Sequence, residues 1–373
     1  MEKKKEKKIK FVSYKTLKRI DAEFILIIGQ RSNGKSYAVK ELCLRDAYER
    51  GEEFAYLRRY DSDVKDYLIT EYFEDFIVRD DNNENKIMEI TNGEFDTISA
   101  YRKNIYFAVT DPETGKVTRC KKIGRMFDLS GVEHHKSLQY PNITKIVFEE
   151  FVTKFSYLPN EPSLLFNLTS TIFRMRKGKV FCIGNTVSRI CPYYGEWGLV
   201  NIPRQKIGSI DIYTVKTDNG FNKTETHIAV YLTDAINFNS GMFFGNSAKS
   251  IVSGLWETDE QPHLIGDIDD YNNIYSLVFL YDKNMFLCEF LQSKIDPNSF
   301  TWFVTPKTTP IQKNTRVCSN LYSINYLHTQ GFKPLNDKES LIFNMLKTGK
   351  VCYADNLTGT EFLQCYNMIR GRI

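Results

Sequence analysis

Residues 29–36 match the phosphate-binding pattern G-x-x-x-x-G-K-[ST] and read Gly29-Gln30-Arg31-Ser32-Asn33-Gly34-Lys35-Ser36. An apolar run at 24–28 precedes them and is typical of a buried strand, and apolar residues at helical spacing follow from Ser36. Such a strand, loop and helix form an anion cradle, because backbone N–H groups and the helix dipole point at the phosphates. We expect these eight residues to bind a nucleoside triphosphate, with Lys35 at the β- and γ-phosphates and Ser36 on Mg²⁺.

Two adjacent carboxylates, Glu149 and Glu150, follow a second apolar run at 146–148. Triphosphate hydrolysis needs one carboxylate for Mg²⁺ and one that activates water, so we assign Glu149 to the metal and Glu150 to the water. The alternative is a pair of solvated acids at the end of a strand. Most P-loop enzymes have Asp at the first position, so Glu149 either reaches the metal through its water shell or shifts it slightly.

Three further polar residues have spacing suited to phosphate chemistry. Asn185 ends another apolar strand and is expected to sense the γ-phosphate, unless it only forms a turn. Arg174 and Arg176 end a predicted helix over 162–176. Either one of them neutralises transition-state charge, often in a neighbouring subunit, or both cap the helix C-terminus. Tyr14, ahead of the first strand, is expected to pack on the base or in the core.

The charge of the chain is balanced outside its first ten residues. The formal net charge is +4, and residues 1–10 hold six Lys and two Glu, so the remainder has 44 basic and 44 acidic residues. This balance excludes a broad basic surface, and any nucleic-acid contact must be a local patch. Candidates for sequence-independent phosphate contacts are Lys121, Lys122, Arg125 and Lys154, although a residue of this kind is more often an ordinary solvated charge.

The eight cysteines form no C-x-x-C pair and no Cys/His cluster with zinc spacing. Reduced core cysteines and a reducing cytosol are therefore expected. No run of about 18 apolar residues and no apolar leader occurs, so we expect neither membrane spanning nor export.

The charge and the pattern of predicted strands and helices divide the chain into four regions. Residues 1–10 form a basic, flexible tail. Residues 11–204 alternate apolar strands with helical patterns, which predicts an α/β P-loop domain with a mainly parallel sheet and a β-hairpin at 104–122. We expect a linker region at 205–262, followed at 263–373 by a smaller β-rich α+β domain with short strands and frequent turns.

Six segments of the first 200 residues resemble the genome-packaging (encapsidation) ATPases of small podophages, of the phi29 type. They are GQRSNGKSY (29–37), FAYLRRY (54–60), YPNITKIVFEEF (140–151), LPNE (158–161), FRMR (173–176) and GNTVS (184–188). They occur in the same order and with similar spacing as in that family. LRRY, YPN and PNE are not general P-loop features, so the set is specific.

The resemblance implies a terminase-like ASCE ATPase that uses ATP and Mg²⁺ to drive double-stranded DNA into a prohead. It implies a homo-oligomeric ring, usually of five subunits, docked transiently on the portal (connector) in the host cytoplasm. Lys35 and Ser36 match the Walker A pair. Glu150 matches the catalytic glutamate, and Arg174 matches an arginine finger acting in trans. Glu149 departs from the family, which usually has Asp there.

The resemblance also implies an RNase H-like C-terminal domain that has lost nuclease chemistry and contacts the portal or a structural RNA. An active nuclease would need several carboxylates that converge on two metal ions. Asp282 falls in a turn where Asp is expected in any case, Glu289 lies on the next strand, and Asp355 is distant. Alternatives are a terminase-like ATPase with an active nuclease, a P-loop helicase or partition ATPase, and a nucleotide-gated structural ring.

Overall fold

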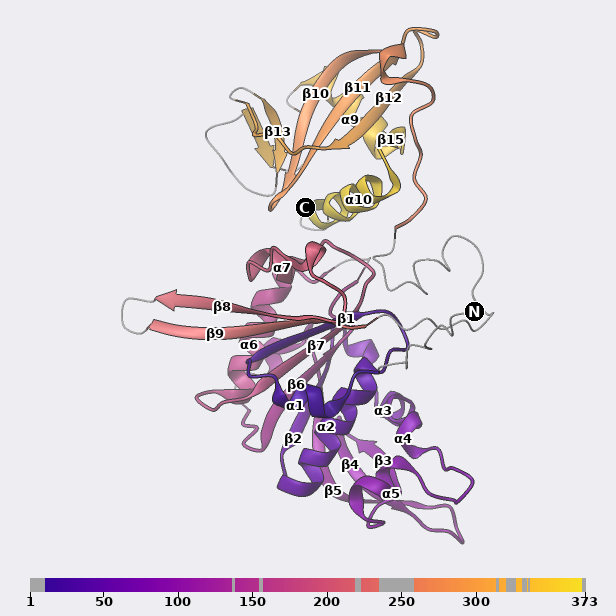
Figure 1. The fold of residues 1–373 in the computed structure, drawn as a ribbon, viewed down its shortest axis with the longest axis vertical. Helices are drawn as coiled ribbons and strands as arrows, with labels where there is room; N and C mark the ends of the chain where they lie inside the picture. Colours follow the sequence, from indigo (N-terminus) through magenta and orange to yellow (C-terminus); the bar gives the residue numbers. More distant parts are fainter. Residues whose placement is uncertain are drawn as a thin grey trace, which may run out of the picture. The chain divides into compact units, whose positions relative to one another are not determined.

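The computed structural model describes residues 11–135, 138–153, 157–218, 223–234, 258–312, 315–319, 327–330, 334 and 336–370. The chain forms two compact units (Figure 1). The first comprises residues 1–153, 160–186 and 199–255, and the second comprises 154–159, 187–198 and 256–373. The expected tail at 1–10 lies outside the described residues.

Within the described residues, the first unit is built on a nine-stranded sheet of order β3-β4-β5-β2-β6-β7-β1-β9-β8. Its strands are β1 (Phe24–Gly29), β2 (Glu53–Arg58), β3 (Thr97–Tyr101), β4 (Asn104–Thr110), β5 (Val117–Asp128), β6 (Ile143–Glu149), β7 (Lys179–Asn185), β8 (Ile210–Asp218) and β9 (Lys223–Leu232). The six central strands from β5 to β9 are parallel, and antiparallel pairs flank them. The predicted α/β fold with a mainly parallel sheet is confirmed.

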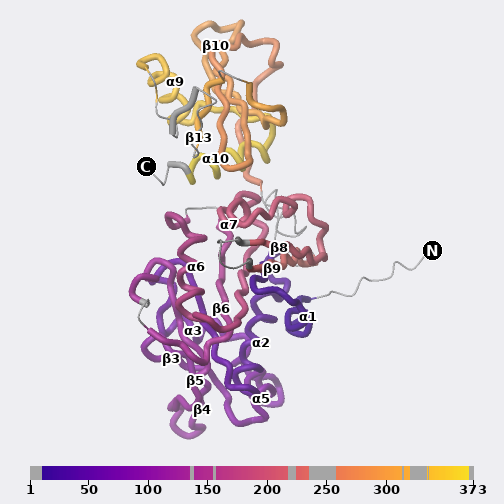
Figure 2. The backbone as a smooth tube through the Cα atoms, turned by 90° about the vertical axis from the view of Figure 1, so that its left-hand side faces the viewer, coloured from indigo at the N-terminus to yellow at the C-terminus, as the bar shows by residue number. Residues whose placement is uncertain are grey.

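Crossover helices cover both faces of this sheet. The helices of the first unit are α1 (Tyr14–Arg19), α2 (Lys35–Arg50), α3 (Asp66–Tyr72), α4 (Glu74–Ile77), α5 (Lys86–Thr91) and α6 (Glu161–Phe173), with 3₁₀ turns η1 (Asp61–Asp63), η2 (Val132–His135) and η3 (Ile202–Arg204). Figure 2 shows α2 and α6 on opposite sides of β6. Ala38, Val39 and Leu42 of α2 join a buried cluster with Ile25 and Ile27 of β1. Burial of each Val, Leu or Ile side chain contributes about 1.5–3 kcal/mol.

The backbone fixes where the two crossover helices begin and end. Gly34, with φ 82°, precedes α2, and Gly51, with φ 70°, follows it. Helix α6 ends at Phe173, so the predicted helix over 162–176 was wrong in its last three residues. Arg174 leaves the helical region, with φ 52° and ψ −118°.

The expected linker at 205–262 was also wrong where strands β8 and β9 lie. These strands pair with each other, and β9 pairs in parallel with β1. The continuous apolar run at 228–232 is buried, with Ala229 and Val230 fully buried, and it allows β9 to extend the first sheet as an interior strand. Residues 219–222 and 235–257 of the expected linker lie outside the described residues.

In its described part, the second unit has a six-stranded sheet of order β14-β13-β10-β11-β12-β15. Its elements are α7 (Pro192–Glu196), η4 (Ile268–Asp270), β10 (Tyr271–Tyr281), β11 (Asn284–Ser293), β12 (Phe300–Pro306), β13 (Arg316–Ser319), β14 (Leu327–Gln330), α9 (Asp337–Lys347), β15 (Val351–Tyr353) and α10 (Asn356–Arg370). Strands β10, β11 and β12 are antiparallel, and β13 and β14 add in parallel beside β10. Counted from β10 as strand one, the order β12-β11-β10-β13-β14 is three-two-one-four-five, which is the RNase H-like arrangement that was expected. Strand β15 adds a sixth strand beside β12.

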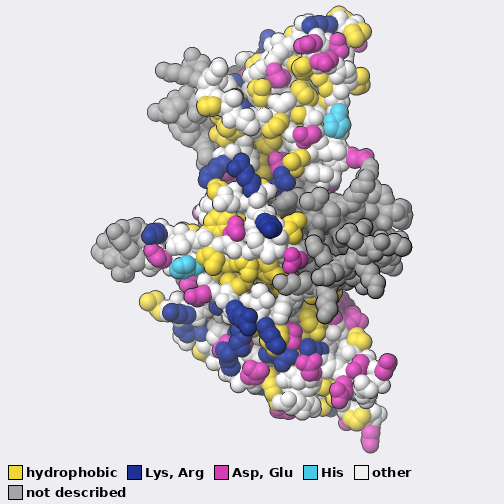
Figure 3. All heavy atoms as spheres, in the orientation of Figure 1, with side chains coloured by type: hydrophobic (Ala, Val, Ile, Leu, Met, Phe, Trp, Pro, Cys, Tyr) yellow, Lys and Arg dark blue, Asp and Glu magenta, His cyan; other side chains and the backbone are white. Residues whose placement is uncertain are grey.

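The drawn face of the first unit carries charged side chains of both signs (Figure 3). On the face drawn in Figure 3, Lys and Arg side chains of the first unit are interspersed with Asp and Glu. No helix in the described part of the chain is long and apolar enough to span a membrane.

Candidate nucleotide-binding site

The candidate site lies where five parallel strands of the first sheet end. In strand order, the residues at or just after these ends are Arg58 (β2), Glu149 (β6), Asn185 (β7), Gly29 (β1) and Thr233 (β9). Because parallel strands bring their carboxyl ends to one edge, polar residues far apart in sequence gather here. Neighbouring strand ends at this edge therefore place the phosphate-binding loop, the Glu149 carboxylate and the Asn185 amide close together.

The loop of residues 29–36 has a backbone that requires glycine at two places. Gly34 has φ 82° in the left-handed region, and a Cβ on Gly29 would lie 1.8 Å from Oγ1 of Thr233. The side chain of Asn33, within the loop, is buried, and its amide donates to the Thr233 hydroxyl. Thr233, directly after β9, thus contacts the phosphate-binding loop and helps to fix its conformation.

Lys35 is buried among oxygen acceptors at the centre of this edge. Its Nζ donates to the carbonyls of Gly29 (3.1 Å) and Gln30 (2.5 Å) and to the amide oxygens of Asn33 and Asn185 (both 3.1 Å). Burial lowers the pKa of Lys35 to about 8, and nearby Glu149 acts in the opposite direction. The ammonium is held in place before any phosphate meets it.

Nucleotide affinity should therefore fall as pH rises through about 8, because neutral Lys35 no longer attracts phosphate. One unit above this pKa, we expect roughly tenfold weaker ADP binding, measured by calorimetry at constant Mg²⁺. Below it the ammonium is charged and affinity should be flat. Lys35→Arg stays charged throughout, so its weaker affinity should not change over this range. If the ADP affinity of the wild-type chain did not change up to pH 9.5, this assignment would be contradicted.

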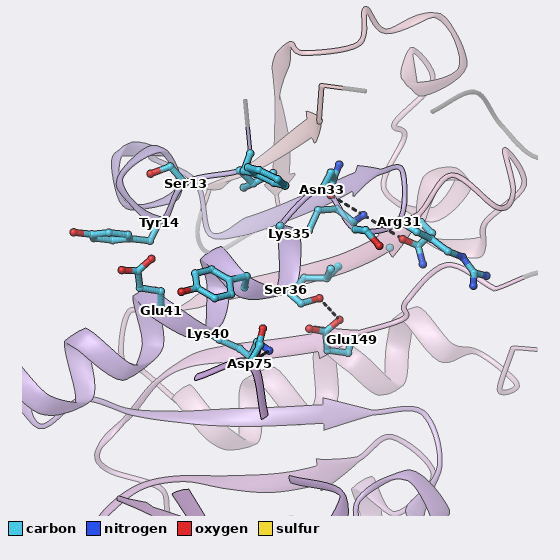
Figure 4. Close-up of a pocket in the computed structure, with 18 of the residues that line it drawn as sticks. Ser13, Tyr14, Arg31, Asn33, Lys35, Ser36, Lys40, Glu41, Asp75 and Glu149 are labelled. Carbon is cyan, nitrogen blue, oxygen red and sulfur yellow. Dashed lines mark hydrogen bonds and ion pairs between the residues drawn. The ribbon is translucent and has the colours of Figure 1, made fainter. Parts of the chain in front are cut away.

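A pocket of about 910 Å³ opens beside the loop. It is lined by Phe11, Val12, Ser13, Tyr14, Lys15, Arg31, Ser32, Asn33, Gly34, Lys35, Ser36, Tyr37, Lys40, Glu41, Asp75, Glu149, Glu150, Ile183, Gly184 and Asn185. In Figure 4, Tyr14 and Arg31 lie at opposite ends of this pocket, with Lys35 and Ser36 between them. The Arg45 guanidinium lies over the Tyr14 ring, 5.0 Å from the ring centroid, so one face of this ring is already occupied.

Glu149 faces the first turn of α2. Its Oε2 accepts from the Ser36 hydroxyl at 3.1 Å, and its Oε1 accepts from the Tyr72 hydroxyl at 2.8 Å. Burial raises the pKa of Glu149, and the hydrogen bonds from Tyr72 and Ser36 act in the opposite direction. A hydroxyl and a carboxylate side by side are hard oxygen donors of the kind that Mg²⁺ prefers, so these residues fit the expected metal.

Glu150 lies at the pocket wall in a different environment. Its side chain is 64% exposed, and Oε2 accepts from Nη2 of Arg58 at 2.7 Å. The backbone of Glu150 has φ 56°, which turns the chain sharply after β6. The two acids of the predicted pair therefore separate, with Glu149 buried toward Ser36 and Glu150 exposed beside Arg58.

A buried ion pair fixes the backbone beneath this turn. Arg59 donates through Nε and Nη2 to Glu161 at 2.7 and 2.9 Å, and through its remaining N–H groups to the carbonyls of Glu150 and Phe151. Arg59 and Glu161 have 8% and 0% exposed side chains. The motif residues of LRRY and PNE thus meet here, far from each other in sequence.

Arg59→Met should lower the free energy of unfolding by about 3–5 kcal/mol, because it removes the guanidinium that forms an ion pair with the buried Glu161 carboxylate. The midpoint of urea unfolding measures this loss. Adding Glu161→Leu should restore much of it. Arg50→Met, which removes an exposed cation 3.7 Å from Asp46, should cost less than about 1 kcal/mol. Equal losses for Arg59→Met and Arg50→Met would refute this role.

The structure places Arg174 and Arg176 outside the pocket of their own chain. Arg174 is exposed, and its Nη2 donates to the carbonyl of Leu138 at 3.0 Å. Arg176 donates to four backbone carbonyls, those of Tyr140, Pro141, Ile143 and Ile172. Arg176 therefore anchors the turn after α6, while the neighbouring Met175 side chain is fully exposed.

Three of the four candidate DNA contacts, Lys121, Lys122 and Arg125, do not line the nucleotide pocket. Lys121 donates to the carbonyl of Tyr48 at 3.0 Å, and Lys122 pairs with Glu53 at 2.8 Å. Arg125 packs against aromatic rings, and Lys154 lies outside the described residues. The DNA role of Lys121, Lys122 and Lys154 stays a prediction.

The acids considered for a nuclease do not converge within the described residues. Asp282 occupies the turn between β10 and β11 with φ 50°. Glu289 lies five residues along β11, roughly 17 Å away, and accepts from Asn273. Asp355 accepts from the backbone of Thr358 at the start of α10. No cluster of three His, Cys, Asp or Glu suited to a metal occurs in the part of the chain that the structure describes.

Sequence reasoning missed several residues of the site. Tyr72 and Thr233 come from segments without any motif, and only the assembled sheet brings them to Glu149 and Asn33. Arg58 lies within the LRRY segment, so its position at the end of a predicted strand was a usable signal.

Comparisons with known proteins agree with this architecture. Residues 114–218 match the family model described as Podovirus DNA encapsidation protein (Gp16). The DNA packaging protein of Bacillus phage B103 is 35% identical over 178 residues, which cover 47% of this chain and 47% of that protein. That of Bacillus phage phi29 is 32% identical over 197 residues, which cover 51% of this chain and 52% of that protein.

These alignments span about half the length of the curated relatives. A solved structure of the bacteriophage Phi-29 viral genome packaging motor assembly aligns with 96% of this chain and 99% of that chain. Its TM-score is 0.55 at 21% identity, so the fold is shared across both units. Residues 114–218 thus match the podovirus DNA encapsidation family, and about half of the chain is similar to DNA packaging proteins of Bacillus phages, the resemblance that the sequence motifs predicted.

Proposed function

We propose that this chain is an ATP-hydrolysing motor that translocates double-stranded viral DNA into a prohead. One observation carries the proposal: Lys35, Ser36 and Glu149 meet at one edge of a parallel sheet, with Glu150 on the wall of the same pocket. This arrangement holds a phosphate-binding cation, metal-binding oxygens and a general base together. The homologous packaging proteins of Bacillus phages support DNA as the substrate that is moved.

Each residue of the edge has a distinct part in the proposed hydrolysis. Bound β- and γ-phosphates would replace some of the acceptors that surround Lys35. Ser36 and Glu149 would hold Mg²⁺, which supplies charge neutralisation for phosphoryl transfer. Glu150 would orient and deprotonate the attacking water once it leaves Arg58. Asn185, bonded to Lys35, lies where it would contact the γ-phosphate.

We further propose that the site is completed by a second copy of the chain within a ring. Arg174 is exposed and absent from the lining of its own pocket, and Arg176 fixes the turn that carries it. An arginine presented in this way suits a site on a neighbouring subunit. The ring would dock on the portal of the prohead, with five subunits and a structural RNA as finer parts of the proposal.

The decisive experiment measures phosphate release with and without double-stranded DNA, on full chains of known oligomeric state. We expect DNA-stimulated hydrolysis that Lys35→Ala abolishes. Lys18→Ala, which changes an exposed cation of α1, serves as the matched control and should leave the rate unchanged. Nucleotide binding without any phosphate release would instead favour a nucleotide-gated structural ring.

An active C-terminal nuclease is not favoured. Asp282 and Glu289 lie at separated positions of one hairpin, whereas two-metal hydrolysis needs carboxylates around a shared centre. Assays of DNA cleavage with Mn²⁺ should show none, and cleavage lost on Asp282→Ala would overturn this view. A helicase would separate the strands of a forked substrate, which we do not expect.

A further inference from the structure

Glu149 has its two carboxylate oxygens divided between two hydroxyl donors. Ser36, the first-turn residue of α2, donates to Oε2 at 3.1 Å. Tyr72, the last residue of α3, donates to Oε1 at 2.8 Å. The side chain at this position is a glutamate, which has one more rotatable bond than aspartate and needs more restraint to hold one orientation.

Tyr72 is itself held firmly. Its side chain packs against Tyr56, with ring centroids 4.6 Å apart, and against Phe73. Its backbone carbonyl accepts from Nζ of Lys40 at 2.8 Å, and the same ammonium lies 4.8 Å from the ring centroid and pairs with Asp75. Lys40 lies one helical turn after Ser36, so helix α2 positions both hydroxyl donors of Glu149.

We propose that Tyr72 is a positioning residue that makes Glu149 a one-oxygen metal ligand and thereby selects Mg²⁺ over Ca²⁺. The inference rests on the proposed nucleotide function, because the metal would enter with the nucleotide. The hydrogen bond from Tyr72 orients the carboxylate and competes with a cation for Oε1, so the oxygen that faces Ser36 is the one presented to the metal.

Mg²⁺ and Ca²⁺ differ in how they bind carboxylates, so the hydrogen bond from Tyr72 to Glu149 should affect the two cations differently. Mg²⁺ demands a small octahedral shell and takes carboxylates through single oxygens, whereas Ca²⁺ accepts six to eight oxygens and often binds a carboxylate through both. A carboxylate restricted to one oxygen therefore disfavours Ca²⁺. Freeing the second oxygen should allow two-oxygen binding and reduce the discrimination.

The test measures binding of the slowly hydrolysed analogue ATPγS to the full chain by calorimetry, with Mg²⁺ or Ca²⁺ titrated separately. Tyr72→Phe keeps the buried ring and removes only the hydroxyl. We expect the preference for Mg²⁺ over Ca²⁺ to fall by about tenfold, the size associated with a hydrogen bond to a charged group. Tyr56→Phe is the matched control, since the Tyr56 hydroxyl interacts with Arg58, and it should keep the wild-type preference.

A double-mutant cycle separates positioning from general damage to the fold. In Glu149→Asp, the shorter side chain no longer reaches the Tyr72 hydroxyl, so the preference should also fall and Tyr72→Phe should add nothing. The Glu149→Asp arm gives the answer even where Tyr72→Phe reduces folding. An unchanged preference in Tyr72→Phe, or additive effects in the cycle, would overturn the proposal. Failure of the wild-type chain to bind ATPγS with either metal would instead overturn the proposed function.

Discussion

Replacing Arg174 with alanine should lower DNA-stimulated ATP hydrolysis by about 10³-fold or more while nucleotide affinity stays near the wild-type value. The loss follows from charge, since a guanidinium that reaches the neighbouring site stabilises the transferring phosphoryl group only in the transition state. Binding is spared because Arg174 lies outside the pocket of its own chain. Phosphate release and ATPγS calorimetry on assembled rings measure the two quantities.

Mixing two inactive variants tests whether Arg174 acts between subunits. Rings formed from Arg174→Ala and Glu150→Gln chains should regain part of the activity, because some interfaces unite an intact Glu150 with an intact Arg174. Lys177→Ala, which removes an exposed cation three residues along the same turn, should hydrolyse ATP at the wild-type rate. Full activity of the Arg174→Ala ring would contradict the role of Arg174 in stabilising the transition state. An inactive mixture of the two variants would argue against action between subunits.

The core of the first unit was readable from sequence because its signals are local. The apolar run before Gly29 identifies a strand, and the Gly-Lys-Ser triplet marks the start of a helix. The bounds of β1 and the first residue of α2 were therefore predicted within one residue. The acidic pair at 149–150 was likewise found at the end of a strand. These features need no knowledge of which strands pair.

What the sequence left out depends on contacts across the sheet. Tyr72 reaches Glu149 from 77 residues away, and Thr233 reaches Asn33 from 200 residues away. The hairpin β8–β9 falls within the expected linker region, and only the pairing of β9 with β1 assigns it to the first sheet. Long-range pairing of this kind is set by tertiary packing rather than by local propensity.

Replacing Glu150 with glutamine should reduce hydrolysis by about 10²–10⁴-fold, because an amide does not accept the proton of the attacking water. The exposed position of Glu150 at the pocket wall means that the change removes little packing, so folding and ATPγS affinity should be preserved. Single-turnover phosphate release measures the chemical step directly. A rate within threefold of wild type would exclude Glu150 as the base.

Asp63→Asn is the matched control for this prediction. Asp63 is a second carboxylate beside Arg58, at 3.8 Å, and does not line the pocket. Its loss should leave hydrolysis close to wild type, since Arg58 keeps Glu150 as its nearer partner at 2.7 Å. Equal defects in Asp63→Asn and Glu150→Gln would show that the charge around Arg58 matters rather than a base at residue 150. A defect confined to Glu150→Gln assigns proton transfer to this side chain.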